Sequence, residues 1–182
     1  MIIGLTGPNA AGKGEAALYL KSKGFIYHSL SDILREESAK LGIASVRKNL
    51  INLGNDLRRK NGPAFLAVRI IGTLTSADNH IVDSIRNPAE VEALRKTGNF
   101  TLIGIDAPSE LRYKRSLLRK RPGDAKTLRE FIEKEKKENK TNIENQQLKK
   151  CLEIANVVIL NNTTIKEFHR KLDETIKTLR AS

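Results

Sequence analysis

Short apolar runs alternate along the chain with longer segments in which apolar residues recur every three or four positions. The apolar runs predict strands near residues 2–6, 25–28, 80–83, 101–106 and 156–160. The longer segments predict helices near residues 13–23, 31–40, 45–60, 63–77, 88–97, 108–120, 126–152 and 163–180. Because strands that alternate with helices form βαβ units, this order predicts an α/β fold with a parallel sheet and helices on both of its faces. We expect residues 1–182 to form a single domain.

A glycine-rich segment, GPNAAGKGE, follows the first predicted strand. Gly7, Gly12 and Lys13 have the spacing of a P-loop. The glycines permit backbone conformations that a Cβ atom forbids, so successive N–H groups can surround a phosphate. The start of the next helix and the charge of Lys13 attract the same anion. The pattern predicts a P-loop NTPase fold, a three-layer αβα sandwich with about five strands. The residues predicted to bind ATP here are Gly7, Pro8, Asn9, Ala10, Ala11, Gly12, Lys13, Gly14 and Glu15.

The third predicted strand ends in the segment VDSIRNP. Ligands of open parallel sheets bind beyond the carboxyl ends of the strands, so we expect Asp83 at the same edge as the P-loop. A carboxylate in this place is suited to hold Mg²⁺ through water, and the alternative is a turn or helix-cap aspartate. Arg86 suits a second phosphate, because a guanidinium group can grip a phosphate through two N–H groups.

Further arginines follow in LRYKRSLLRKRPGD, which ends in the strongest internal break, RPGD at 121–124. Arg112, Arg115 and Arg119 are spaced by three and four residues, which places them on one helical face. Such arginines can stabilise the charge that develops in phosphoryl transfer, and the alternative is an exposed basic helix. Two regions that bind phosphate and face one P-loop imply two phosphorylated ligands.

These motifs resemble those of the nucleoside monophosphate kinase group of P-loop proteins. The likeness extends over essentially the full length and is strongest to adenylate-kinase-related and dephospho-coenzyme A kinase-like proteins of archaea. It implies an acceptor-binding region at 31–77 and a short helical lid at 112–140. Glycine after the lysine is usual in adenylate kinases, in which magnesium is held largely through water.

The resemblance also implies roles on the acceptor side. SLSDILR is similar to the family's Gly-Asp-Leu-Leu-Arg segment, so that Asp32 and Arg35 are expected at the acceptor phosphate, although Asp32 alone would also serve as a helix cap. Arg59, before a Gly-Pro break, is expected in the same region. VDSIR looks like the family's strand-end Asp followed by a phosphate-binding Arg, which implies that Asp83 organises Mg²⁺ through water and that Arg86 binds the acceptor.

On the donor side, RYKRSLLRKR resembles the start of the family's mobile lid, which implies that Arg115 and Arg119 reach the donor phosphates. VILNN falls where the family's last strand passes the donor base, which implies a contact of Asn161 with ATP. The residues expected to act in catalysis are Lys13, Asp83, Arg115 and Arg119.

Two features depart from the adenylate kinase pattern. Glu15 stands where adenylate kinases have a threonine for an α-phosphate, and the lid has no cysteine or zinc insertion. Glu15 either stabilises the start of its helix or reaches the water shell of Mg²⁺ or an acceptor group. Both departures leave the acceptor unnamed.

The formal net charge of +12 suggests polyanionic partners, which are either nucleotides or nucleic acid. With three Tyr, five Phe and no Trp, few aromatic residues are present to stack on bases. Cys151 is the single cysteine, and neither a signal peptide nor a membrane-spanning run is expected, which favours a cytoplasmic protein. Nothing in the sequence specifies an oligomeric state.

The leading hypothesis is therefore an ATP- and Mg²⁺-dependent kinase. Its acceptor would be a nucleoside monophosphate or a similar phosphate-bearing small molecule, with dephospho-coenzyme A kinase-like activity as an alternative. A nucleotide-dependent protein associated with nucleic acid, and a P-loop regulator without turnover, are the alternatives from other classes.

Overall fold

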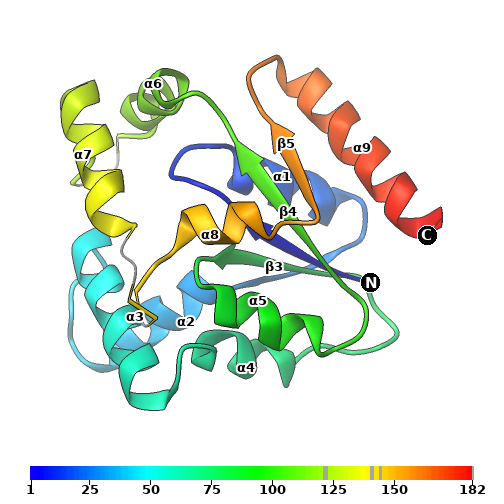
Figure 1. The fold of residues 1–182 in the computed structure, drawn as a ribbon, viewed down its shortest axis with the longest axis horizontal. Helices are drawn as coiled ribbons and strands as arrows, with labels where there is room; N and C mark the ends of the chain where they lie inside the picture. Colours follow the sequence, from blue (N-terminus) through cyan, green and yellow to red (C-terminus); the bar gives the residue numbers. More distant parts are fainter. Residues whose placement is uncertain (121–122, 140–141, 144, 182) are drawn as a thin grey trace.

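The computed structural model describes residues 1–120, 123–139, 142–143 and 145–181, and its centre is a five-stranded sheet (Figure 1). The strands lie in the order β2-β3-β1-β4-β5, and all four neighbouring pairs are parallel. The strands are β1 (Ile2–Thr6), β2 (Ile26–Ser29), β3 (His80–Ile85), β4 (Phe100–Asp106) and β5 (Val157–Leu160). The expected α/β fold with a parallel sheet is confirmed.

Helices connect the strands and lie on both faces of the sheet. They are α1 (Lys13–Ser22), α2 (Leu30–Lys40), α3 (Arg47–Asn61), α4 (Phe65–Ile71), α5 (Pro88–Arg95), α6 (Ser109–Arg119), α7 (Leu128–Glu138), α8 (Leu148–Glu153) and α9 (Ile165–Ala181). Side chains alternate across a strand, and β1 accordingly sends Ile2 to one face and Ile3 to the other.

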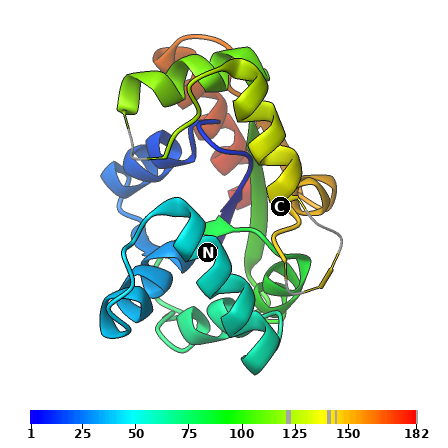
Figure 2. The ribbon, with the colours of Figure 1, turned by 90° about the vertical axis from the view of Figure 1, so that its left-hand side faces the viewer.

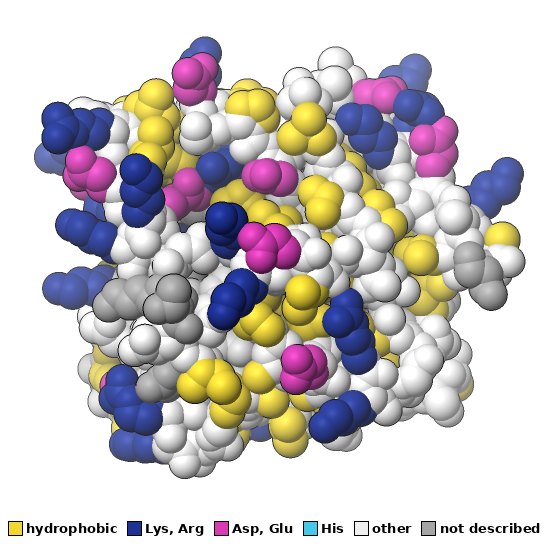
Figure 3. Space-filling model, in the orientation of Figure 1, with side chains coloured by type: hydrophobic (Ala, Val, Ile, Leu, Met, Phe, Trp, Pro, Cys, Tyr) yellow, Lys and Arg dark blue, Asp and Glu magenta, His cyan; other side chains and the backbone are white. Residues whose placement is uncertain are grey.

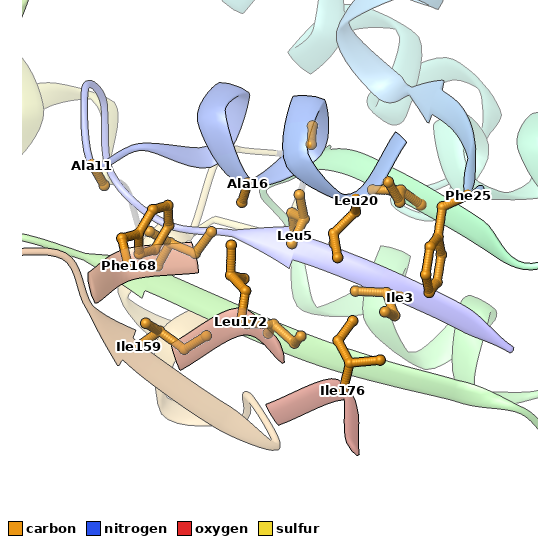
Figure 4. Close-up of a cluster of buried hydrophobic side chains, with 14 residues drawn as sticks. Ile3, Leu5, Ala11, Ala16, Leu20, Phe25, Ile159, Phe168, Leu172 and Ile176 are labelled. Atoms are coloured by element: carbon orange, nitrogen blue, oxygen red, sulfur yellow. The ribbon is translucent and has the colours of Figure 1, made fainter. Parts of the chain in front are cut away.

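The two faces carry separate apolar clusters. On one face, α1 and α9 pack against the sheet, and Figure 4 shows Phe168 and Leu172 of α9 directed toward Leu5 of β1. On the other face, α2, α4, α5 and α8 cover the sheet with a second cluster of buried side chains. The sheet is thus the middle layer of three.

Two helix predictions need correction. The helix expected near 63–77 is only α4, which ends at Ile71. Gly72 follows as its C-cap, and the Thr73 hydroxyl then donates to the Ile70 carbonyl oxygen at 2.7 Å, so that a turn replaces further helix.

The helix expected over 126–152 is instead two helices, α7 and α8. Helix α7 ends at Glu138, and the backbone of its C-cap residue, Asn139, leaves the helical region with ψ 71°. Beyond it, the Asn87 amide donates to the Asn145 carbonyl oxygen at 3.0 Å, and the Gln147 N–H donates to the Arg86 carbonyl oxygen at 2.7 Å. These contacts with the loop after β3 outweigh the helix-forming composition of the segment. Residues 140, 141 and 144 lie outside the described part.

The lid expected at 112–140 corresponds to α6 and α7, apart from residues 121, 122 and 140, which lie outside the described residues and include Arg121 and Pro122 of the expected RPGD break. Figure 2 shows α7 running from the level of α6 toward α3, on the side of the sheet where the strands end. The carboxyl ends of the parallel strands therefore point to the side of the molecule on which α3 and α7 lie.

Candidate functional site

The loop between β1 and α1 has a conformation that two of its glycines make possible. Gly7 has a φ of 139°, and a Cβ atom there would lie 2.0 Å from the Ile105 carbonyl oxygen. Gly12 has a φ of 116°, and a Cβ atom there would lie 2.2 Å from Nδ2 of Asn161. Both positions exclude a side chain by backbone strain and by collision. The loop is thereby held against β4 and the end of β5.

Lys13 starts α1 and turns its side chain back over this loop. Its Nζ donates to the carbonyl oxygens of Gly7 at 2.7 Å and of Pro8 at 2.9 Å. The pKa of Lys13 is lowered to about 7, mainly by burial; the charge of Asp83 opposes this change and the charge of Arg86 adds to it. A half-buried cation whose hydrogen bonds go to carbonyl oxygens favours a bound anion.

Asp83 lies near the end of β3 and is buried. Its Oδ1 accepts the Ser84 N–H at 2.6 Å, and its Oδ2 accepts the Tyr27 hydroxyl at 3.3 Å. Burial and the charge of Asp83 raise the pKa of Tyr27 to about 12, so that Tyr27 remains a donor. Each carboxylate oxygen keeps acceptor capacity beyond these bonds.

Arg86 follows β3, in the loop that leads into α5. Its Nη1 donates to Oε1 of Gln146 at 3.2 Å, and burial lowers its pKa to about 10. The β3–α5 loop is held by the fully buried Glu90, whose Oε2 accepts the Arg86 N–H at 2.9 Å. The other oxygen, Oε1, accepts two bonds from Arg58, at 2.9 and 2.7 Å. Arg58 thus acts as part of the framework.

Helix α6 connects three arginines with the phosphate loop. Arg115 donates to the carbonyl oxygens of Ala11 at 3.4 Å and of Asn161 at 3.1 Å. Arg119 donates to Oδ1 of Asn9 at 3.0 Å and forms an ion pair with Asp124. Arg112, which is buried, donates to the Ala107 carbonyl oxygen at 2.8 Å and pairs with Glu135 of α7. The expected helical arginine face is turned toward the loop.

Asn161 is the residue at the end of the last strand for which the sequence predicts a contact with ATP. It is buried at the end of β5, and its Nδ2 donates to the Ala11 carbonyl oxygen at 2.8 Å. The Asn161 side chain thus fixes the loop, and Arg115 rests against the same residue.

Beside the loop lies a cavity of about 230 Å³. Its lining joins α2, α3 with the segment before it, the β3–α5 loop, the end of α6 with the segment after it, and the segment before α8. It comprises Ser31, Leu34, Arg35, Ser45, Val46, Arg47, Leu50, Ile51, Arg86, Arg119, Asp124 and Gln146. Arg35, Arg86 and Arg119 are brought together here from three separate motifs. The cavity therefore combines several guanidinium groups with an apolar wall.

Arg47 and Gln146 were missed by the sequence analysis. Arg47 starts α3, lines the cavity and pairs with Glu138 of α7, with 2.8 Å between Nε and Oε1, so the ion pair joins α3 to α7. The residues of this pair are 91 positions apart and belong to no local motif.

Three other expected site residues contact side chains of the protein itself. Asp32 forms an ion pair with Arg35 within α2. Arg59 is exposed on α3 and pairs with Asp56 at 3.0 Å, away from the cavity lining. Glu15 accepts a hydrogen bond from His169 of α9, with 2.8 Å between Oε1 and Nε2. A role of Asp32, Arg59 or Glu15 at a ligand stays a prediction.

For magnesium, the donor set fits one mode of binding. The described residues contain no cluster of three or more His, Cys, Asp or Glu side chains that would enclose a metal ion. One buried carboxylate, Asp83, faces the phosphate loop with acceptor capacity left. This suits Mg²⁺, which commonly keeps several waters and is held by one or two carboxylates and the phosphates of a substrate.

On the face seen in Figure 3, Lys and Arg side chains lie among acidic and apolar ones. In the described part of the chain, no helix has both the length and the apolar character that a membrane crossing requires.

No protein-family model matches the chain. A UPF0200 protein of Pyrococcus horikoshii is 31% identical over 186 residues, which cover 98% of this chain and 97% of that protein. Among solved structures, TT1252 of Thermus thermophilus has a TM-score of 0.62 at 18% identity, and the match covers 98% of this chain and 97% of the TT1252 chain. Shikimate kinase of Aquifex aeolicus has a TM-score of 0.52 at 15% identity, covering 100% and 99% of the two chains. These structures show that the chain has a P-loop kinase-like fold.

Proposed function

This chain belongs to the UPF0200 family, and we propose that it is an ATP-dependent phosphotransferase whose acceptor carries a phosphate of its own. One observation carries the proposal: Lys13 and Arg86 are two half-buried cations close to the same carboxylate, Asp83. Among the described residues neither is hydrogen-bonded to a carboxylate side chain. Two such cations at one strand edge suit two anionic ligands that meet there.

The donor nucleotide would bind over the loop. Its phosphates would take the N–H groups at the start of α1 and the ammonium group of Lys13. Arg115 and Arg119 would neutralise charge on the transferring group, since both already contact the loop. Asp83 would hold Mg²⁺ through water, and the metal would supply further charge neutralisation. ATP as the donor accords with the kinase-like fold and with the placement of Asn161.

The acceptor would occupy the cavity of about 230 Å³. Arg86 would hold its phosphate, with Arg35 and Arg119 beside it, while Leu34, Val46 and Leu50 would pack against an uncharged part. A phosphate oxygen is already ionised near neutral pH and attacks without a strong general base. No such base is needed beside Asp83.

The proposal is tested by measuring ATP consumption with Mg²⁺ against a panel of acceptors. The panel comprises nucleoside monophosphates, dephospho-coenzyme A, shikimate as an acceptor without phosphate, and no acceptor. We expect turnover with one phosphate-bearing compound, and the Arg86→Ala variant should lose most of it. ATP binding without acceptor-dependent turnover would contradict a kinase and favour a regulator. A preference for shikimate would contradict the phosphate-bearing acceptor.

A further inference from the structure

A group of polar and aromatic side chains joins α1 to α9. Glu15 of α1 and His169 of α9 lie 2.8 Å apart, measured from Oε1 to Nε2. The His169 ring stacks on Tyr19 with 3.9 Å between centroids and 14° between planes. The Tyr19 hydroxyl donates to Oδ2 of Asp173 at 2.7 Å. The proposed catalytic roles involve none of these contacts.

Glu15 occupies a position from which a carboxylate can block the loop. Gly12 is the N-cap of α1, so Glu15 is the third helical residue. A glutamate at this position commonly reaches back to the N–H group of the N-cap residue. That N–H belongs to the loop, and in the described chain no side chain caps the start of α1. A Cβ atom added at Gly14 would meet nothing within 4 Å, so the space over the helix start is open.

The structure shows the Glu15 carboxylate directed to His169 instead. An ionised carboxylate only accepts hydrogen bonds, so the imidazole must present Nε2–H to it. Stacking on Tyr19 fixes the plane of the ring, and Asp173 fixes Tyr19. Phe168, the residue before His169, is buried in the α1–α9 core near Ala11 of the loop (Figure 4). His169 is therefore held at a defined place beside the start of α1.

We propose that His169 is a positioning residue for nucleotide binding, which holds the Glu15 carboxylate off the loop N–H groups that a phosphate would use. The inference rests on the proposed binding of ATP at this loop. Without His169, Glu15 would act as an internal competitor, because its carboxylate would cap α1 and repel the phosphates. The threonine expected at this position in adenylate kinases carries no charge and would need no such partner.

The test is a double-mutant cycle on ATP affinity measured by calorimetry, using wild type, His169→Ala, Glu15→Gln and the double variant. We expect His169→Ala to weaken ATP binding roughly fivefold, as a charge interaction of about 1 kcal/mol would. In the Glu15→Gln background the same change should have no effect. His169→Gln, which keeps an N–H donor, should recover part of the affinity. Ile176→Val is the matched control, since it loosens the packing of α9 against α1 without touching the contacts among Glu15, His169 and Tyr19.

The outcomes separate this inference from the proposed function. A wild-type protein that binds no ATP would refute both. If ATP binds and His169→Ala matches wild type, only the inference fails. It also fails if His169→Ala is equally harmful with Glu15→Gln, or if Ile176→Val weakens binding as much, because loosened packing of α9 would then explain the loss. Thermal melting of each variant verifies that it is folded.

Discussion

The phosphate loop and the cavity beside it are held by different kinds of contact. In the loop, main-chain groups are the partners: Lys13 donates to the carbonyl oxygens of Gly7 and Pro8, and Asn161 donates to that of Ala11. The residues that determine this geometry are mostly neighbours in the chain. A short motif can therefore specify the loop almost by itself.

Around the cavity, charged side chains from distant segments are the partners. Arg47 pairs with Glu138 across 91 residues, and Arg58 pairs with Glu90 across 32. Such pairs gain their attraction only after the helices are in place, and burying them carries a desolvation cost. We call the phosphate loop with its contacts the donor half of the site, and the cavity with the ion pairs around it the acceptor half. The structure of the donor half should tolerate single substitutions, whereas that of the acceptor half should depend on a few charged side chains. Four predictions test this difference.

The largest effect is expected in the framework under the acceptor half. Glu90→Gln should lower the free energy of unfolding by about 3–5 kcal/mol, because it leaves the Arg58 guanidinium buried without its opposite charge. Urea denaturation measures this. Arg59→Ala is the matched control, since Arg59 is the neighbouring arginine and its ion pair with Asp56 is exposed. A Glu90→Gln variant as stable as Arg59→Ala would show that the acceptor half does not rest on this pair.

In the donor half, Lys13→Ala should reduce kcat/KM for ATP by on the order of 100- to 1,000-fold, as loss of a transition-state donor does. Its stability should not fall, because the change removes a cation that burial already disfavours. Turnover assays and thermal melting measure the two effects, and Lys23→Ala, at the end of the same helix, is the control. Full activity in a folded Lys13→Ala protein would contradict the P-loop role.

The same contrast explains what the sequence predicts well. The positions of the five strands and of the phosphate loop follow from local patterns, namely apolar runs and the spacing of Gly7, Gly12 and Lys13. Asp83 was expected at the strand edge because parallel strands end together, and it lies there. These features need no knowledge of distant contacts.

The features that were missed depend on tertiary contacts. Gln146 lines the cavity because its segment is held against the loop after β3, although its composition favours helix. Arg47 and His169 each meet a carboxylate that lies far away in the chain. No spacing rule relates such residues. A sequence shows that they are charged or polar, and only the fold shows what they contact.

A third prediction concerns the border between the two halves. Arg86→Ala should raise KM for the acceptor by roughly ten- to a hundredfold, the loss of hydrogen bonds to a charged group. Arg115→Ala, which affects contacts of the loop, should lower kcat with little change in that KM. Arg119 both lines the cavity and contacts Asn9, so Arg119→Ala should change both constants. Steady-state kinetics with either substrate varied measures this, and equal behaviour of Arg86→Ala and Arg115→Ala would remove the division.

The smallest expected effect is the pH dependence of ATP affinity that follows from the protonation of Lys13. In the ligand-free protein the pKa of Lys13 is lowered to about 7, mainly by burial. A bound phosphate favours the charged ammonium, so the pKa should return toward its ordinary value of 10.5. Between these values the free protein has lost a proton that the complex keeps. ATP binding should therefore take up a proton, and the affinity should fall, by no more than about tenfold per pH unit, as the pH rises above 7.

Below about pH 7 both states carry the proton, and the contribution of Lys13 should become constant. Calorimetry at about pH 6 and about pH 8, in buffers that differ in ionisation enthalpy, measures the uptake directly. Lys13→Met serves as the control because it retains the proton changes of the nucleotide itself and loses those of the lysine. Proton uptake at the higher pH should thus be larger in the wild type than in Lys13→Met. Equal uptake would mean that Lys13 is already charged in the free loop, and that the carbonyl oxygens of Gly7 and Pro8 compensate for its burial before any phosphate binds.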